Sequence, residues 1–362
     1  MSIGRRKFLA GLAAAGGGLL AGCAGSGTPR GMRGNARVID AHAHWHSPEF
    51  VALLEKEGAA NGAKMGRNAR GQVTFNFPGY TTVFQEAYMD PAIRLKYMDS
   101  TGVDIHVLSL TSPMVYWAPP AFGLKLAQVY NDSLSTVHLR YPNRLYGLVT
   151  LPMQAPNLAV QELDRAANLP GMRGVYLATH VMGKNLDDKS FWPVYERCEA
   201  LGLTVLLHPV DPVGAQRMQS YYLRNFLGNP YDTGIAAASL MFGGVMDAFP
   251  NLQVVLPHAG GTFPALIGRM THGSAVRPET KHMTKAPMTY LRRFHYDTIS
   301  HSPQIMGDII RMVGVDRVVM GTDHPADMSL ERPIEFVDSI PQLSNYEREL
   351  ILGGNSARLL KI

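Results

Sequence analysis

The sequence predicts an α/β protein whose main domain is a (β/α)8 barrel. From residue 37 onward, short apolar runs alternate with amphipathic stretches, and strands that alternate with helices in this way form parallel sheets. Eight such units are present, which is the number that closes into a barrel. The alternative is an open doubly wound sheet, which typically has a glycine-rich phosphate-binding loop after an early strand. Here the first run leads straight into histidines.

The predicted strands are short apolar runs bounded by turn residues. They are 37–41, 104–110, 145–151, 173–178, 203–208, 252–258, 294–298 and 317–321. Helical patterns lie between them at 90–100, 124–139, 158–167, 191–201, 235–249 and 303–313. Residues 59–89, rich in Gly and Asn, interrupt the alternation, and we expect them to form a lid over the barrel mouth. The barrel domain is therefore expected to span residues 37–362.

The first 22 residues resemble a bacterial export signal. Arg5 and Arg6 precede an apolar run that is too short and too rich in small residues for a transmembrane helix, as in twin-arginine signals. The run ends in Leu-Ala-Gly-Cys, which resembles a lipobox, so we expect cleavage before Cys23 and acylation of its thiol. Residues 23–36 are predicted to be a flexible tether. The expected location is a membrane-anchored lipoprotein on the periplasmic or outer face, exported by the twin-arginine route.

Charge and cysteine content exclude two other classes of protein. The formal net charge is +5, but three of the basic residues lie in the predicted signal, so the mature chain is close to neutral. No basic run with interleaved aromatics occurs later, and a nucleic-acid partner is not expected. The second cysteine, Cys198, has no partner once Cys23 is acylated. It is predicted to be a buried, inert thiol rather than half of a disulfide.

Histidines gather at the predicted strand ends. His42 and His44 are two apart on the first strand, so their side chains share a face. His208 ends the fifth strand, His258 ends the sixth, and Asp323 follows the eighth. Because all strands of a barrel end at one mouth, these side chains should meet in space. Imidazole and carboxylate together suit zinc, or manganese, and the fourth strand has no Lys or Glu to bridge two ions. One metal ion is predicted.

These residues and several motifs resemble the amidohydrolase superfamily, in its amidohydrolase-related branch, and in detail the aminocarboxymuconate-semialdehyde decarboxylase family. The motifs are Tyr141-Pro142, residues 150–156 (Thr-Leu-Pro-Met-Gln-Ala-Pro), Thr179-His180-Val181, Gly243-Gly244-Val245, His258-x-Gly260-Gly261 and Gly321-Thr322-Asp323. The resemblance extends over residues 38–360. It implies the distorted TIM barrel of metal-dependent hydrolases and a carboxy-lyase that acts on a small unsaturated or aromatic carboxylic acid.

The resemblance also implies roles for individual residues. It assigns the ligands of one divalent metal, with water as a further ligand, to His42, His44, His208 and Asp323. His258 corresponds to the catalytic histidine beside that water, and Asp323 takes part in the same proton transfer. Arg269 corresponds to an arginine that reaches a substrate carboxylate in the neighbouring subunit, which implies a homodimer.

The sequence departs from the family at the expected substrate wall. Asn76 stands where the family has its second carboxylate-binding arginine, Asn225 where it has a pocket tryptophan, and Ala326 where it has a phenylalanine. Asn76 and Asn225 are therefore candidate substrate contacts. His180 and Asp297, after the fourth and seventh strands, are expected either to line the pocket or to make structural hydrogen bonds. We expect a substrate different from that of the family's namesake.

Three functions remain open from the sequence. The first is a metal-dependent decarboxylase in which the metal binds water and His258 moves the proton. The second is a hydrolase of an amide, ester or lactone with the same parts. The third is a lipoprotein that binds metal or small acids without turnover. An arginine pair for a carboxylate would favour decarboxylation, and only Arg269 is visible.

Overall fold

The computed structural model describes residues 37–77 and 80–362. The predicted signal at 1–22, the predicted tether at 23–36 and the predicted lipid attachment at Cys23 lie outside the described residues. The domain boundaries predicted for that part of the chain stay predictions.

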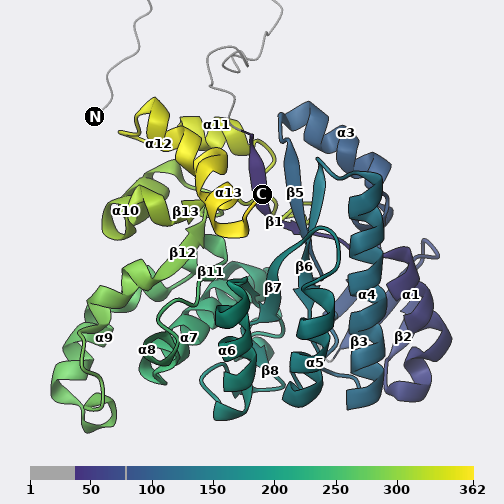
Figure 1. The fold of residues 1–362 in the computed structure, drawn as a ribbon, viewed down its shortest axis with the longest axis horizontal. Helices are drawn as coiled ribbons and strands as arrows, with labels where there is room; N and C mark the ends of the chain where they lie inside the picture. The colour runs from purple at the N-terminus through teal and green to yellow at the C-terminus, as the bar shows by residue number, and fades with distance from the viewer. Residues whose placement is uncertain (1–36, 78–79) are drawn as a thin grey trace, which may run out of the picture. The chain divides into compact units, whose positions relative to one another are not determined.

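Within the described residues, eight parallel strands form one sheet in which the order in space follows the order in the chain (Figure 1). They are β1 (Ile39–His44), β5 (Ile105–Ser109), β6 (Leu145–Thr150), β7 (Met172–Ala178), β10 (Thr204–His208), β11 (Val254–Leu256), β12 (Phe294–Asp297) and β13 (Val318–Val319). The last strand returns to the first, because Ala41 N donates to Met320 O at 2.9 Å and His44 N donates to the carbonyl of His324 at 2.7 Å. The predicted barrel is confirmed, and each strand overlaps its predicted range.

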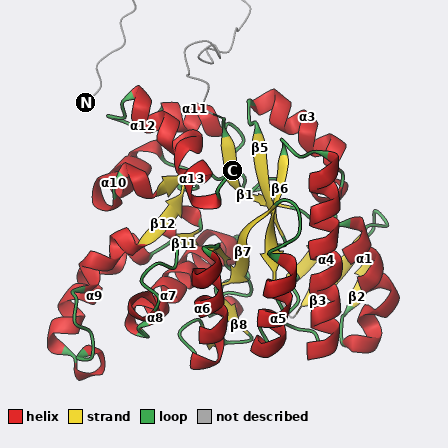
Figure 2. Ribbon diagram, viewed as in Figure 1, coloured by secondary structure: helices red, strands yellow, loops and turns green. Residues whose placement is uncertain are grey.

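The strands are covered on both faces. Every residue of β1, β6 and β10 is buried, as expected for strands with helices outside and side chains filling the barrel inside. Figure 2 shows the strands in the interior with the helices around them. The helices are α1 (Pro48–Leu53), α2 (Glu86–Met89), α3 (Pro91–Thr101), α4 (Pro120–Arg140), α5 (Pro156–Ala166), α6 (Trp192–Leu201), α7 (Asn229–Phe242), α8 (Val245–Ala248), α9 (Phe263–Val276), α10 (Pro303–Val313), α11 (Pro333–Asp338), α12 (Asn345–Glu349) and α13 (Asn355–Leu360). None of the described helices is long and apolar enough to cross a membrane.

Local sequence explains where several helices begin and end. The Asp90 side chain accepts from Ala92 N at 2.7 Å and caps α3, and Gly102, with a φ of 74°, ends that helix. The helix predicted over 235–249 is wrong in one respect, because the structure divides it into α7 and α8. Gly244 between them has a φ of 80°, a conformation that ends the first helix and that side-chain-bearing residues rarely adopt.

The insertion after β1 forms a small antiparallel sheet on the mouth side of the barrel. Its strands are β2 (Met65–Arg67), β3 (Val73–Phe77) and β4 (Tyr80–Val83). Thr82 Oγ1 donates to Ser112 Oγ at 3.0 Å, and the guanidinium carbon of Arg224 lies 4.6 Å from the centre of the Tyr80 ring. Ser112 and Arg224 lie in the segments that follow β5 and β10, so the insertion contacts the chain at the carboxyl ends of these strands. A second short hairpin, β8 (His180–Val181) with β9 (Lys184–Asn185), follows β7.

Candidate metal centre

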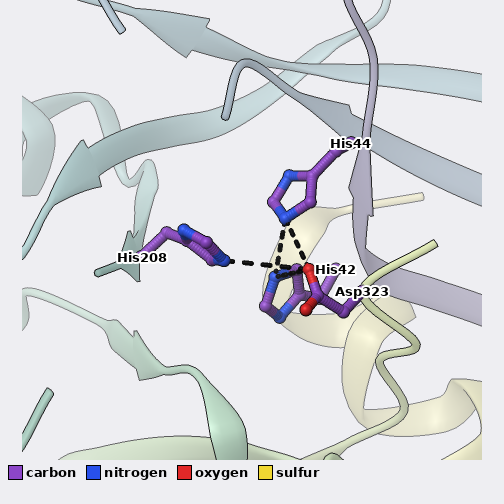
Figure 3. A group of neighbouring side chains, drawn as sticks. All are labelled: His42, His44, His208 and Asp323. Atoms are coloured by element: carbon purple, nitrogen blue, oxygen red, sulfur yellow. Dashed lines mark hydrogen bonds and ion pairs between the residues drawn. The ribbon is translucent and has the colours of Figure 1, made fainter. Parts of the chain in front are cut away.

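Four buried side chains converge at the mouth of the barrel (Figure 3). They form the metal cluster, which consists of His42 and His44 on β1, His208 at the end of β10, and Asp323 after β13. One ligand atom from each lies within 4.8 Å of all the others. His44 Nε2 is 2.7 Å from Asp323 Oδ1, and His42 Nε2 is 3.3 Å from His44 Nε2. Among the described residues this is the one such group of potential ligands, and it contains the four residues that the family resemblance assigns to the metal.

The protonation states of His44, His208 and Asp323 suit a divalent cation. Burial lowers the pKa of His208 to about 4 and holds the pKa of His44 well below its usual value, so both imidazoles are neutral at neutral pH. Burial alone would raise the pKa of Asp323, but the imidazoles of His208, His258 and His44 beside its carboxylate outweigh burial and hold that pKa well below its usual value. Neutral imidazole and ionised carboxylate are the forms that bind metals.

An unsatisfied imidazole also fits a bound ion. Both ring nitrogens of His208 are buried and have no hydrogen-bond partner among the described residues. A buried polar atom left without a partner costs about 1–3 kcal/mol, and a cation held by the cluster would satisfy one of these nitrogens. The nitrogen and oxygen donors of the cluster match the ligands that zinc and manganese take in proteins. The residues present therefore fit the predicted metal.

Asp297 at the end of β12 orients the first ligand. Its Oδ2 lies 2.7 Å from His42 Nδ1, and its Oδ1 accepts from Ala259 N at 2.8 Å and Ile299 N at 3.0 Å. Burial acts to lower the pKa of His42, but the hydrogen bond to Asp297 and the nearby carboxylates raise it. With Nδ1–H donated to Asp297, Nε2 is left for the cluster. Asp297 was expected either to line the pocket or to make structural hydrogen bonds. The structure shows the hydrogen bonds, and one of them is made with the backbone of Ala259, next to His258.

Ser109 at the end of β5 orients the second ligand. Its hydroxyl donates to Ala43 O at 3.2 Å, and its oxygen lies 3.0 Å from His44 Nδ1. The hydroxyl therefore accepts the Nδ1 proton of His44, which leaves Nε2 free for the cluster. Ser109 was not among the site residues predicted from the sequence. Its position at the end of the second strand was the available signal.

Asp40 ties β1 to the segment that carries the aspartate ligand. Its carboxylate accepts from His42 N at 3.0 Å, from Thr322 N at 3.1 Å and from Thr322 Oγ1 at 2.5 Å. Burial raises the pKa of Asp40 to about 6 despite these hydrogen bonds. Thr322 directly precedes Asp323, so a single buried carboxylate fixes the spacing between two ligand-bearing stretches of chain.

Arg94 on α3 is wholly buried and contacts the backbone of a cluster residue. Its guanidinium donates to the carbonyl oxygen of His44 and lies with Nη1 3.0 Å from His106 Nδ1. A buried arginine is rare unless its N–H groups are used, and here they hold the backbone of a metal ligand. Nothing in the sequence pattern indicated Arg94, because it lies on a helix and not at a strand end.

His258 lies beside the metal cluster without belonging to it. Its Nε2 is 3.6 Å from Asp323 Oδ2. His258 and Ala259 have φ values of 53° and 55°, in the left-handed region that costs side-chain-bearing residues energy and that concentrates at functional sites. His258 and Asp323 form part of the wall of a cavity of about 300 Å³, which we call the mouth cavity. A titratable imidazole thus lies between the ligand cluster and an open space.

The remaining predicted substrate contacts divide into two groups. Asn225 lines the mouth cavity. The amide of Asn76 is instead hydrogen-bonded inside the small sheet, and His180 Nε2 lies 3.1 Å from the carbonyl oxygen of Asp211. Arg269 is exposed on α9 and does not line the cavity of its own chain. Substrate binding by Asn76, His180 and Arg269 stays a prediction.

Comparison with known proteins places this barrel and its metal cluster in a family. The family model described as Amidohydrolase matches residues 39–362, and the chain belongs to that family. The 2-amino-3-carboxymuconate-6-semialdehyde decarboxylase of Dictyostelium discoideum is 35% identical over 326 residues, which cover 89% of this chain and 91% of the relative. The gamma-resorcylate decarboxylase of a Polaromonas species is 28% identical over 289 residues, 74% of this chain and 86% of the relative. The crystal structure of 5-carboxyvanillate decarboxylase from Sphingomonas paucimobilis superimposes with a TM-score of 0.78 at 26% identity, covering 91% of this chain and 100% of the other.

Proposed function

We propose that this protein is a metal-dependent carboxy-lyase that releases CO2 from a small aromatic or unsaturated carboxylic acid. The observation that carries the proposal is His258, an imidazole outside the ligand cluster but 3.6 Å from the ligand Asp323 and in the wall of the mouth cavity. An imidazole that is not a metal ligand can carry a proton to or from a substrate, so this group is suited to proton transfer beside a metal. The relatives described above, all named as decarboxylases, support the reaction type.

The residues divide the chemistry between them. A divalent cation held by the metal cluster would supply positive charge that binds oxygen atoms of the acid. The mouth cavity holds the rest of the molecule, so that the carbon bearing the carboxylate lies near His258. His258 gives a proton to that carbon, the bond to the carboxylate breaks, its electron pair returns to the ring or chain, and CO2 leaves. His258 then regains a proton from water. Asp323 Oδ2, at 3.6 Å, stabilises the protonated imidazole.

The test is a screen of aromatic acids and lactones with metal-loaded protein. We expect one CO2 for each acid consumed, with no CO2 from the same protein after chelation. Hydrolysis of a lactone, ester or amide without any CO2 release from the acids would overturn the proposal in favour of the hydrolase alternative, because both reactions use the same ligands.

We propose zinc or manganese as the metal, since three imidazoles and one carboxylate suit both ions better than calcium or magnesium. Elemental analysis of protein purified without added metal decides between the two. A predominance of calcium or magnesium would contradict the proposal.

We propose a homodimer in which Arg269 reaches the active site of the neighbouring subunit. The family resemblance supports this role, and the exposure of Arg269 on α9 is compatible with it. His258→Ala and Arg269→Ala subunits, each impaired alone, should recover activity when mixed, because one site of each mixed dimer is then intact. Verified mixed dimers without recovery would contradict the shared site.

We propose that the chain is exported by the twin-arginine route and anchored through an acylated Cys23. The order of the paired arginines, the apolar run and the Leu-Ala-Gly-Cys ending supports this proposal. Cys23→Ser should abolish lipid labelling and move the protein out of the membrane fraction. Replacing Arg5 and Arg6 together by lysine should block export, and unimpaired export of that variant would contradict the route.

A further inference from the structure

Three arginines gather at the end of the barrel opposite the mouth. Arg292 precedes β12, Arg317 precedes β13, and Arg358 lies on α13. We call these three residues the basal arginine cluster. All of them contact Asp316. Its Oδ1 lies 3.0 Å from Arg292 Nη2, its Oδ2 lies 3.3 Å from Arg317 Nε, and its backbone carbonyl accepts from Arg358 Nη2 at 3.0 Å. One carboxylate therefore lies among three guanidinium groups.

The cluster keeps an excess of positive charge. Burial lowers the pKa of Arg317, Asp316 acts to raise it, and the positive charges of Arg292, Arg358 and Arg293 lower it further. The charged groups that act most strongly on Arg317 are thus three cations and one anion. The side chain of Arg292 is 52% exposed, and Arg358 is exposed as well. Because arginine stays protonated, this end of the barrel presents positive charge to its surroundings.

The arginines of the mouth side are balanced differently. Arg67 in the insertion forms an ion pair with Glu55, and Arg224 after β10 pairs with Asp211 at 3.2 Å. Each of these two guanidinium groups has a carboxylate of its own. The excess positive charge of the basal arginine cluster is therefore a property of one end of the barrel.

The chain enters the barrel beside this cluster. β1 begins two residues after Arg37, and α13 packs against β1 (Figure 1). The carbonyl of Arg37 lies against Gly353, where a Cβ would be only 1.8 Å from its oxygen. Gly353 leads directly into α13, which carries Arg358. An anchor upstream of Arg37 would therefore pull on the end of the barrel that carries the basal arginine cluster.

The length of the chain upstream of the barrel limits distance but not orientation. Arg37 is fourteen residues after Cys23, a span of at most about 50 Å if the chain were fully extended. With that reach, a barrel attached at Cys23 stays close to the bilayer but is free to turn. A second contact is needed to fix which side of the barrel faces the lipid, and an excess of positive charge at one end can supply it.

We propose that the basal arginine cluster binds the anionic headgroups of the membrane that holds the acylated Cys23. Each basic residue close to an anionic bilayer strengthens binding about fivefold. Salt screens this attraction, so three arginines orient an anchored barrel but do not retain an unanchored one at physiological ionic strength. The mouth then points away from the bilayer, and the substrate acid enters from water. This inference rests on the proposed anchoring, which determines the membrane that the cluster meets.

The test measures how the full-length Cys23→Ser chain, which cannot be acylated, binds to vesicles at low salt. The measured quantity is the ratio of binding to phosphatidylcholine vesicles with and without phosphatidylglycerol. Replacing Arg292 and Arg358 together by glutamine should lower this ratio about 10- to 30-fold, and high salt should abolish the difference. The residues before Arg37 are the same in every variant, so their own affinity for lipid cancels in the comparison.

Two control variants make the result specific. Arg67→Gln combined with Arg217→Gln removes the same charge from exposed residues on the mouth side and should leave the ratio unchanged. Arg292→Lys combined with Arg358→Lys keeps the charge and should keep the ratio, whereas a site shaped for one particular anion would lose it. An unchanged ratio in the glutamine variant, or a lost ratio in the lysine variant, would overturn the inference.

Thermal unfolding of each variant verifies that it is folded. If the double glutamine variant does not fold, Arg358→Gln alone changes one exposed side chain and should lower the ratio about fivefold. An unchanged ratio in that single variant would equally overturn the inference.

The vesicle experiment is separate from the tests of anchoring and of the reaction. Lipid labelling of the wild-type chain reports on Cys23, and CO2 release reports on the mouth. A lowered ratio in the glutamine variant without any labelling of the wild type would remove the anchor and leave the lipid-binding surface. Labelling of the wild type with an unchanged ratio would keep the anchor and refute the role of the basal arginine cluster.

Discussion

Replacing Asp297 by asparagine should weaken metal binding while the barrel stays folded. The change removes the charged carboxylate oxygen that accepts a hydrogen bond from His42 Nδ1 at 2.7 Å. The imidazole of His42 is then free to rotate or to change its tautomer. A hydrogen bond to a charged group contributes about 1.5–3 kcal/mol. Since each 1.4 kcal/mol is about tenfold in affinity, the metal dissociation constant should rise about 10- to 100-fold, as is typical when the partner of a metal-binding histidine is lost.

The assay is competition between the protein and a chromogenic chelator of known affinity, with thermal unfolding of the metal-free protein measured in parallel. Asp316→Asn is the matched control. It removes an aspartate that is 40% exposed, lies before β13 at the other end of the strands, and pairs with Arg292 at 3.0 Å. Its metal affinity should equal that of the wild type. A loss of stability in Asp297→Asn with unchanged metal affinity would falsify the role of Asp297 in orienting the ligand.

Three further outcomes are expected. His258→Ala should retain its metal while turnover falls about 10²–10⁴-fold, as on loss of a general acid or base, and a parallel loss of metal would mean that His258 is itself a ligand. Burial raises the pKa of Cys198 to about 12, so its thiol should react slowly in the native protein. In a Cys23→Ser background the native protein should therefore resist maleimide at pH 8 and react fully once it is unfolded. Labelling of the native protein at the rate of a free thiol would contradict this. Arg94→Met should lower the free energy of unfolding by about 1–3 kcal/mol, because two buried acceptors lose their donor. Lys96→Met, an exposed change on the same helix, should leave it unchanged, and equal stabilities of the two variants would argue against the buried contact.

The barrel could be predicted from the sequence because each strand is a buried apolar run between turn residues, and that pattern is local. The end of β1 was harder to predict from the sequence. The apolar run ends at residue 41, and the spacing of His42 and His44 was the only sign that the strand continues; pairing with β5 does continue through Ala43 with Leu108 and His44 with Ser109. Backbone pairing, not apolarity, sets the end of a strand, and for that reason the two ligand histidines lie on the strand itself.

The supporting contacts of the site were harder to predict because they join residues far apart in the chain. His42 and Asp297 are 255 residues apart, and their 2.7 Å contact depends on how the first and seventh strands of the barrel sit next to the eighth. The convergence of strand ends indicated that such residues would be near one another, but not which pairs would bond. The same holds for α10, where the sequence shows an apolar face but not that Ile305 and Ile309 line the mouth cavity.

The central claim is a mononuclear metal site, and anomalous diffraction from crystals of the metal-loaded protein tests it most directly. Data collected on both sides of the absorption edges of zinc and manganese also identify the element. We expect one strong anomalous peak per chain, about 2.0–2.2 Å from nitrogen or oxygen atoms of His42, His44, His208 and Asp323, with His258 outside bonding distance. Two peaks at the barrel mouth, or a single peak bound by His258, would contradict the account.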